Sequence, residues 1–324
     1  MKTAFLKKAI DPIVYFFWKS QINILRNCPP MCGVVSKYSL GAANSSFVWM
    51  KTLLQLTAET PRALLQHSRN KREGRVALAR ITFLVTTRCS LNCDKCSSHI
   101  PDIKCNRDTP FEDIAQYLEN LLAGVDYIYA FILSGGEAFL HPDIDKIIRL
   151  VAASDKIGDL SMQSNGTFVP NAKVLAALRE TNTLVKISNY GAHQPNVDKV
   201  MQAFKENSIR YTHLSGTFWN ETGEFGQRQE GSAQRRYSAC IQQLCMPCLN
   251  GKLHRCAKSA VMMEEGCIPD CPDEYVDLRV PNPEAFRAQW EAMLKKRALT
   301  ACSWCLGLSY NASKIPVAVQ RERG

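Results

Sequence analysis

Long apolar runs are missing from the start of this chain. The longest of them, residues 13–18, has six residues, whereas a helix that crosses a bilayer needs about 20. No stretch there has the length of a secretory signal peptide. We therefore expect a cytoplasmic protein without a transmembrane helix.

The chain also lacks a Gly-x-Gly-x-x-Gly turn after its first predicted strand, which argues against a dinucleotide-binding fold. Its 324 residues are 46% hydrophobic, with a mean hydropathy of −0.18. These values are typical of a globular protein with one large core or two modest ones.

Cysteine, in contrast, is abundant, with 14 residues. In a secreted chain this number would suggest disulfides. Without a signal peptide, metal ligation in a reducing cytoplasm is the better explanation.

Positive charge is concentrated in the first 80 residues, which contain 13 Lys and Arg and three acids, a surplus of +10. The remaining 27 bases and 27 acids cancel, since the whole chain has 40 and 30. We expect residues 1–79 to be a basic, mostly helical extension in which Asp11 caps a helix that contains Pro12. This helix either binds an anionic membrane surface peripherally or packs on the body with its lysines solvated.

Residues 80–214 alternate between strand-like and helix-like patterns. Strands are predicted at 80–86, 128–134, 158–163, 184–188 and 209–214, and helices at 110–123, 141–153, 171–180 and 194–207. Successive strand–helix units imply an α/β fold with a parallel sheet. A sixth strand is not identifiable from the sequence.

Three cysteines follow the first predicted strand at the spacing C-x3-C-x2-C: Cys89, Cys93 and Cys96. Thiolates on one short loop can bind three irons of a four-iron cluster. An electron-transfer cluster has a fourth cysteine, so this loop would leave one iron open to another ligand. The alternative is a zinc site in which His99 is the fourth ligand.

The second predicted strand ends in Gly135, Gly136 and Glu137, where backbone can approach a ligand closely and an acid can meet an amino group. Together with the cysteine loop, this motif resembles the radical S-adenosylmethionine (SAM) superfamily. The resemblance implies a partial (β/α)6 TIM-like barrel, a four-iron four-sulfur cluster on the three cysteines, and SAM bound to the open iron. The aromatic residue that usually precedes the third cysteine is Lys95 here.

The resemblance also places SAM contacts at three strand ends, namely Gly135, Gly136, Glu137, Asn165 and Ser188. For Asn165 the alternative is a simple Asn-Gly turn. Several polar residues on the fourth and fifth units could face a substrate, but none can be chosen as a catalytic acid or base: Tyr190, His193, Tyr211 and His213.

Residues 215–238 are polar and rich in glycine, so we interpret them as a connector. Beyond them, eight cysteines occupy only 66 positions, a density that indicates metal ligation: Cys240, Cys245, Cys248, Cys256, Cys267, Cys271, Cys302 and Cys305.

The order C-x15-C, a gap, then C-x2-C, with Gly251 at a predicted hairpin turn, resembles the twitch domain, a shortened relative of the SPASM domain. The resemblance implies an auxiliary four-iron four-sulfur cluster domain at 239–306, followed by a tail at 307–324. Its candidate ligands are Cys240, Cys245, Cys256, Cys302 and Cys305, among which Cys245 competes for one position.

Two alternatives stay open for the later cysteines. Cys267 and Cys271 could contribute to a second auxiliary cluster. A zinc ribbon would instead use Cys245, Cys248, Cys302 and Cys305.

The resemblance implies an enzyme that cleaves SAM reductively, with an electron from a flavodoxin- or ferredoxin-type donor, and abstracts hydrogen through a 5′-deoxyadenosyl radical. We expect it to oxidise, epimerise or rearrange a sugar- or cyclitol-type substrate. The first alternative is a maturase of ribosomally made peptides. A second, of another class, is a non-catalytic iron–sulfur scaffold, which would never release 5′-deoxyadenosine. Nucleic acid is not an expected partner, because the body is not basic.

Overall fold

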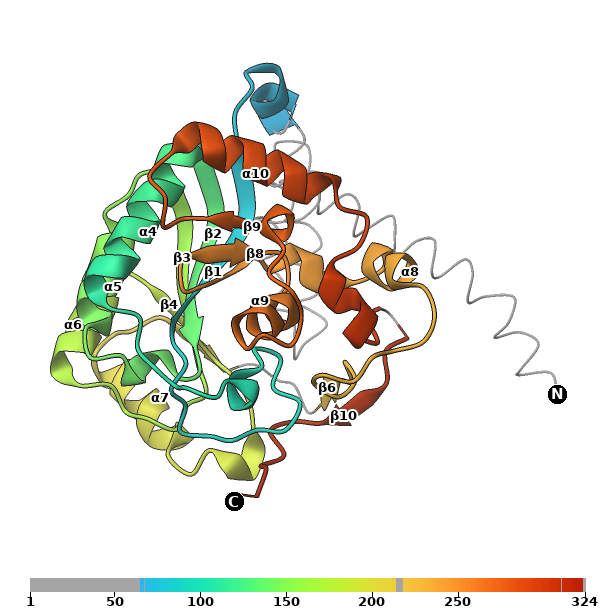
Figure 1. Ribbon diagram of the computed structural model, residues 1–324. Coiled ribbons are helices and arrows are strands. Elements are labelled where there is room, and N and C mark those ends of the chain that lie inside the picture. Colours follow the sequence, from blue (N-terminus) through green and yellow to red (C-terminus); the bar gives the residue numbers. More distant parts are fainter. Residues whose placement is uncertain (1–64, 67, 214–217, 310, 323–324) are drawn as a thin grey trace.

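The computed structural model describes residues 65–66, 68–213, 218–309 and 311–322 (Figure 1). The predicted N-terminal helix, and with it the membrane hypothesis, lies outside these residues. None of the described helices is long and apolar enough to cross a membrane.

An eight-stranded sheet with the order β5-β4-β3-β2-β1-β7-β8-β9 forms the centre of the molecule (Figure 1). Its first five strands in the chain are mutually parallel: β1 (Ala77–Thr86), β2 (Tyr127–Gly135), β3 (Ile157–Ser164), β4 (Leu184–Ile187) and β5 (Tyr211–His213). The helices between them are α4 (Phe111–Gly124), α5 (Ile144–Ala152), α6 (Ala172–Glu180) and α7 (Val197–Glu206). The predicted α/β fold with a parallel partial barrel is thereby confirmed, with element ends shifted by about three residues at most.

The sixth parallel strand is β7 (Pro247–Leu249), which pairs with the free edge of β1 rather than following β5. Phe83 of β1 lies opposite Cys248. Two antiparallel strands, β8 (Lys252–His254) and β9 (Tyr275–Asp277), extend the sheet on this side. A strand of three residues that begins with proline has no alternating pattern, which explains why the sequence did not reveal it.

Helices α4 to α7 cover one face of the sheet (Figure 1). The core between them is built from buried aliphatic and aromatic side chains, such as Phe131 and Leu133 of β2 and Leu121 of α4. Helix α4 contributes because its apolar side chains recur every three or four residues and so lie on one side. Leu253, Val276 and Phe286 from the cysteine-rich part belong to the same apolar cluster.

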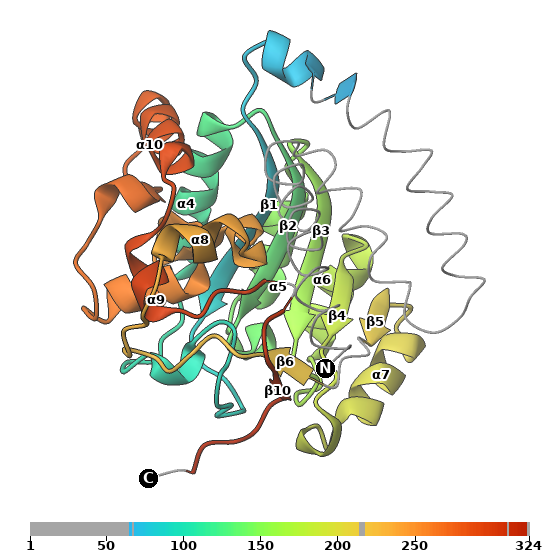
Figure 2. The ribbon, with the colours of Figure 1, turned by 90° about the vertical axis from the view of Figure 1, so that its right-hand side faces the viewer.

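Three further helices are α8 (Ala233–Ser238), α9 (Ala257–Glu264) and α10 (Pro283–Lys295). Residues of α8 and α9 lie beside the second cysteine group, whereas α10 packs on α4 and β9. Helix α10 begins where expected from local chemistry, because Asn282 accepts hydrogen bonds from the backbone of Glu284 and Ala285 and Pro283 occupies the first turn. A separate two-stranded antiparallel sheet joins β6 (Phe218–Asn220) to β10 (Lys314–Pro316), near the carboxyl ends of the parallel strands (Figure 2). The proposed connector, 215–238, thus contains β6 and α8.

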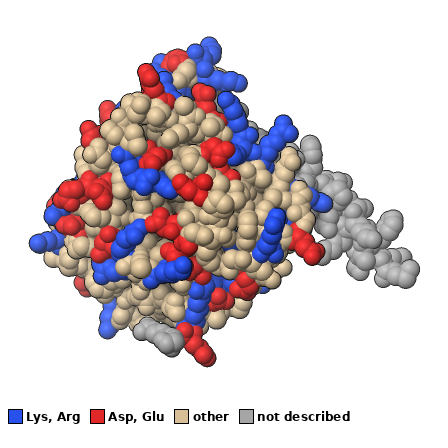
Figure 3. Space-filling view, in the orientation of Figure 1, with Lys and Arg blue, Asp and Glu red and all other residues tan. Residues whose placement is uncertain are grey.

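Charged side chains of both signs are interspersed over the face of the molecule shown in Figure 3. This distribution agrees with the balanced charge of residues 81–324.

We predict that Phe286→Ala destabilises the barrel as well as the cysteine-rich part. The Phe286 side chain is 4% exposed and lies over Gly124 of α4, where an added Cβ would come within 2.4 Å of the ring. Removing the ring leaves a cavity in the shared core, which should lower the free energy of unfolding by about 3–5 kcal/mol. Urea denaturation followed by circular dichroism measures this change.

Arg287→Ala, on the exposed side of the same helix, is the matched control and should change stability by about 0.5 kcal/mol or less. Equal stability of the two variants would contradict a shared core.

Candidate functional site

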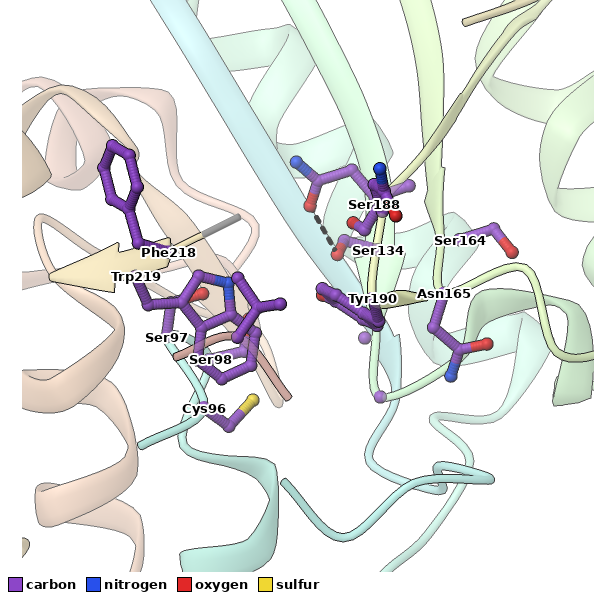
Figure 4. A pocket seen from close by; sticks show the side chains of 15 residues that line it. Cys96, Ser97, Ser98, Ser134, Ser164, Asn165, Ser188, Tyr190, Phe218 and Trp219 are labelled. Carbon is purple, nitrogen blue, oxygen red and sulfur yellow. Dashed lines mark hydrogen bonds between the residues drawn. The ribbon is translucent and has the colours of Figure 1, made fainter. Parts of the chain in front are cut away.

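A cavity of about 250 Å³ lies at the carboxyl ends of β1 to β4 (Figure 4). Four of the predicted SAM contacts line it: Gly135, Gly136, Asn165 and Ser188. Cys96, Phe218 and Trp219 form one side, and the strand ends with Ser134 and Tyr190 form the other (Figure 4). The carboxyl ends of parallel strands are where such barrels carry their sites.

Gly135 and Gly136 let the end of β2 approach the cysteine loop. The backbone N–H of Gly136 donates to the Thr86 carbonyl at 2.9 Å, and that of Glu137 donates to the Arg88 carbonyl at 2.9 Å. A Cβ added at Gly136 would lie 2.3 Å from the Arg88 oxygen, and one at Gly135 would lie 2.2 Å from the Thr86 oxygen. Only glycine fits at these two positions.

Glu137 is fully buried and lies behind the cavity wall. Its carboxylate accepts hydrogen bonds from the backbone of Phe139 at 3.1 Å and of Asn165 at 2.7 Å, and from the Ser164 hydroxyl at 3.1 Å. Burial raises the pKa of Glu137 to about 7, against the lowering effect of these donors. In this geometry the carboxylate fixes the end of β3 and does not reach into the cavity.

Asn165 connects the end of β3 to the cysteine loop. Its Nδ2 donates to the Ser90 hydroxyl at 3.0 Å and lies 3.5 Å from the Cys89 sulfur. Its Oδ1 accepts from the backbone and hydroxyl of Thr167 at 3.0 and 2.7 Å. The side chain therefore does more than a simple turn requires.

Gln194 is a residue that the sequence analysis missed. Its buried side-chain amide donates to the carbonyls of both Asn165 and Ser188 and accepts from the Tyr190 backbone N–H at 2.7 Å. It thereby holds the ends of β3 and β4 at a fixed spacing. A single glutamine in a loop carries no spacing signal by which the sequence could reveal this function.

The three loop cysteines are free thiols within one partly buried loop. Burial raises the pKa of Cys89 to about 11 and also raises those of Cys93 and Cys96. These thiols would stay protonated unless a metal centre bound them as thiolates. Leu91 N–H and the Gln320 side chain donate toward the sulfurs of Cys89 and Cys93 at 3.5 and 3.2 Å, as is common for iron–sulfur ligands.

Two neighbours of these cysteines are engaged elsewhere. His99 Nδ1 lies 3.0 Å from the Asp102 carboxylate, its ring packs against Phe225, and burial lowers the pKa of the imidazole. Lys95 forms an ion pair with Glu224 and lies 3.8 Å from Glu221. The lysine thus ties the loop to the segment after β6.

A second, mostly apolar cavity brings together four of the later cysteines: Cys240, Cys256, Cys302 and Cys305. Cys240 follows α8, Cys256 precedes α9, and the other two belong to the 3-10 helix Thr300–Trp304 and the residue after it. Backbone N–H groups of Leu308 and Gly307 point at the sulfurs of Cys240 and Cys305 at 3.4 and 3.3 Å.

Basic residues outnumber acidic ones among the described residues around this cavity. Arg236, Arg255 and Lys258 line it, and no Asp or Glu is among its described lining residues. Each cation donates to backbone carbonyls, for example Lys258 Nζ to Thr222 at 3.2 Å and Arg236 Nε to Cys302 at 3.1 Å. Buried cations are stable when negative charge lies nearby. Four thiolates around an iron–sulfur cluster would supply it.

Burial raises the pKa of Cys240 to about 11 and that of Cys302 to about 12. As in the first loop, these thiols lose their protons readily only to a bound metal centre. The four residues therefore fit an auxiliary cluster chemically.

The other candidate cysteines lie outside this cavity. Cys245 Sγ accepts a hydrogen bond from Arg80 Nη2 at 2.8 Å. Cys248 is buried in the main core on β7, Cys267 is exposed, and Cys271 Sγ lies 3.3 Å from the Pro269 carbonyl. The four cysteines of the zinc-ribbon alternative are thus not brought to one place.

Within the described ranges, no three His, Cys, Asp or Glu side chains converge as a single metal ion would require. A four-iron cluster does not need such convergence, because each cysteine binds a different iron.

Of the polar residues considered as substrate contacts, Tyr190 lines the first cavity. Its ring meets Trp219 edge-on at a centroid distance of 5.6 Å, and burial raises the pKa of its hydroxyl. Tyr211 packs against Phe204 and His213 is exposed, so neither is a wall of this cavity.

Comparison with known proteins places this geometry in context. Residues 83–212 match the model of the Radical SAM superfamily. The GTP 3',8-cyclase of Lactiplantibacillus plantarum is 34% identical over 103 residues, which are 31% of this chain and 30% of that protein. The 7,8-dihydro-6-hydroxymethylpterin dimethyltransferase of Methanocaldococcus jannaschii is 34% identical over 98 residues, 30% of this chain and 19% of that protein. The chain thus spans less than a third of the length of these curated relatives.

Solved structures show more distant likenesses. BtrN in complex with AdoMet and 2-DOIA has a TM-score of 0.42 at 17% identity, covering 71% of this chain and 94% of that one. Streptococcus suis SuiB bound to its precursor peptide SuiA has a TM-score of 0.40 at 10% identity, covering 78% and 74%.

We predict that Gly136→Ala abolishes most iron binding by the cysteine loop. The new Cβ would clash with the Arg88 carbonyl and lie 2.8 Å from the Cys89 Cβ, so the loop must move away from β2. Iron analysis and the visible absorption of anaerobically reconstituted protein measure the loss.

Gly226→Ala is the control for backbone strain, because its φ is +81° while a Cβ there meets nothing within 4 Å, so it strains the chain without touching the cysteine loop. If both variants bind iron like the unaltered chain, the close contact is not needed for the site.

Proposed function

Because residues 83–212 belong to the radical SAM superfamily, we propose that this protein is an enzyme that removes a hydrogen atom from a carbon of its substrate. Cys89, Cys93 and Cys96 would hold the four-iron four-sulfur cluster of this family. When bound, the cluster and SAM together supply a 5′-deoxyadenosyl radical, after one electron from a flavodoxin- or ferredoxin-type donor.

The protein's own residues bind and orient SAM in this proposal. The backbone of Gly135 and Gly136 would accommodate its methionine part, and Ser188 would lie near the ribose hydroxyls. Asn165 is the remaining polar contact at these strand ends. Glu137 would hold these contacts in place from behind the cavity wall, because its carboxylate accepts a hydrogen bond from the Asn165 backbone N–H at 2.7 Å.

The substrate class is supported by the chemistry of the part of the cavity wall that the proposed SAM contacts do not occupy. None of the described residues that line it carries a charged side chain. Hydroxyls and amides, including Ser97, Ser98 and Gln163, line it together with the ring of Trp219. Ser97 and Ser98 lie on the same side as this ring (Figure 4). This combination suits a neutral, hydroxyl-rich ring, because its hydroxyls find hydrogen-bond partners and its apolar face finds an aromatic side chain. We infer a sugar- or cyclitol-type substrate, which is oxidised, epimerised or rearranged.

The second cavity supports a role in electron transfer. Four cysteines around one cluster leave no iron open to a substrate. We infer that Cys240, Cys256, Cys302 and Cys305 hold an auxiliary four-iron four-sulfur cluster. Such a cluster could accept the electron of a substrate radical, which favours a net two-electron oxidation.

Iron content tests both clusters. We predict about eight irons per chain in the reconstituted protein and about four in either Cys89→Ala or Cys256→Ala, since each change removes one four-iron cluster. Cys245→Ala and Cys267→Ala should keep about eight, because neither thiol lines the cavity. Zinc in place of iron, or a halved iron content in Cys245→Ala, would contradict this assignment.

Isotope transfer tests the reaction. We predict that deuterium from a carbon-deuterated nucleotide sugar or cyclitol appears in 5′-deoxyadenosine, and that Cys89→Ala releases none. Mass spectrometry of the product makes the measurement with a reducing agent present. Transfer from deuterated peptides alone would replace the sugar proposal with peptide maturation, and no release of 5′-deoxyadenosine from any substrate would favour a scaffold.

A further inference from the structure

A segment far along the chain, 318–321, lies directly against the cysteine loop. Gln320 forms an antiparallel bridge with Cys93. The Asp94 N–H donates to the Val319 carbonyl at 2.6 Å, and the Arg321 N–H donates to the Asn92 carbonyl at 2.7 Å. Residues 92–94 of the cysteine loop are thus paired with a strand-like strap, residues 318–321.

The side-chain amide of Gln320 is completely engaged. Its Oε1 accepts the Asn92 N–H at 2.8 Å. Its Nε2 donates to the Ala318 carbonyl at 2.6 Å and toward the Cys93 sulfur at 3.2 Å. The amide orientation is fixed by this network, because Asn92 offers only a donor and Ala318 only an acceptor.

Arg321 anchors the strap to the other end of the loop. Its guanidinium lies 2.7 Å from the Asp102 carboxylate and 3.2 Å from the Pro101 carbonyl. Asp102 in turn holds His99, three residues after Cys96. The strap therefore contacts the cysteine loop at residues 92–94 and also the segment that follows Cys96, at Pro101 and Asp102.

The same segment continues from a wall of the first cavity. Strand β10 pairs with β6, with Pro316 opposite Phe218, and Val317 lines the cavity. Ala318, which follows, is fully buried at a φ of +51°. The cavity wall and the strap are thus one stretch of chain.

We propose that Gln320 is a positioning residue of the SAM-binding cluster. Its amide N–H donates to the Cys93 thiolate, and its carbonyl holds Asn92, so that the loop keeps the spacing that the cluster needs. A hydrogen bond to a ligating sulfur draws negative charge from the cluster, which favours the reduced state and raises the reduction potential. The inference relies on the proposed cluster at Cys89, Cys93 and Cys96.

The test uses the full chain with Gln320→Leu, which removes every polar contact of the side chain at similar size, and Gln320→Glu, which places a carboxylate beside the thiolate. Val319→Ala is the matched control, because the Val319 side chain is 46% exposed and its backbone pairing stays intact. The potential is measured by redox titration of the electron paramagnetic resonance signal that changes when SAM is added. Iron release to a chelator is measured in parallel.

We expect a shift to a more negative potential and iron release several times faster in Gln320→Leu, larger effects in Gln320→Glu, and no change in Val319→Ala. Hydrogen exchange of the metal-free protein is the second measurement and should show faster exchange at the Asn92 amide in Gln320→Leu. Faster exchange with an unchanged potential would make Gln320 merely structural and overturn the proposal. An unaltered chain without any SAM-responsive iron signal would overturn the cluster assignment together with it.

Discussion

The close contact between the cysteine loop and the end of β2 is the constraint on which the first site depends. Thr86 and Arg88 offer their carbonyls to the backbone of residues 136 and 137, and two glycines make this approach possible. The contact places the cysteines beside the strand ends that carry Asn165 and Ser188. A cofactor held by the loop would therefore lie at the mouth of the barrel, where the other polar groups converge.

Both cysteine groups share one electrostatic condition. Burial keeps their thiols neutral in the absence of a metal, as the raised pKa values of Cys89 and Cys302 indicate. Around the second group, the buried Arg255 and Lys258 and the half-buried Arg236 add positive charge. In the proposed clusters, metal binding and charge compensation would be coupled, because thiolates would form only with the metal and would then balance the cations.

The sequence predicted the parallel barrel well, because β1 to β5 are long or flanked by helices with clear apolar periodicity. It could not predict β7, whose three residues show no pattern, or its position beside β1. Spacing identified the later cysteines as a group, but the fold decides which thiols face one cavity, and Cys245, which accepts a hydrogen bond from Arg80, does not line it. Gln194 and Gln320 act through three-dimensional contacts alone, and no motif marks an isolated amide.

The place of β7 has a consequence for the newly made chain. β1 is the first of the described strands to leave the ribosome, yet the strand that covers its second edge is made roughly 160 residues later. At about 5–20 residues per second, this delay is on the order of ten seconds. During that time no other described strand pairs with this edge of β1, and unpaired strand edges invite aggregation. This edge of β1 therefore completes its hydrogen bonding only after β7 has left the ribosome.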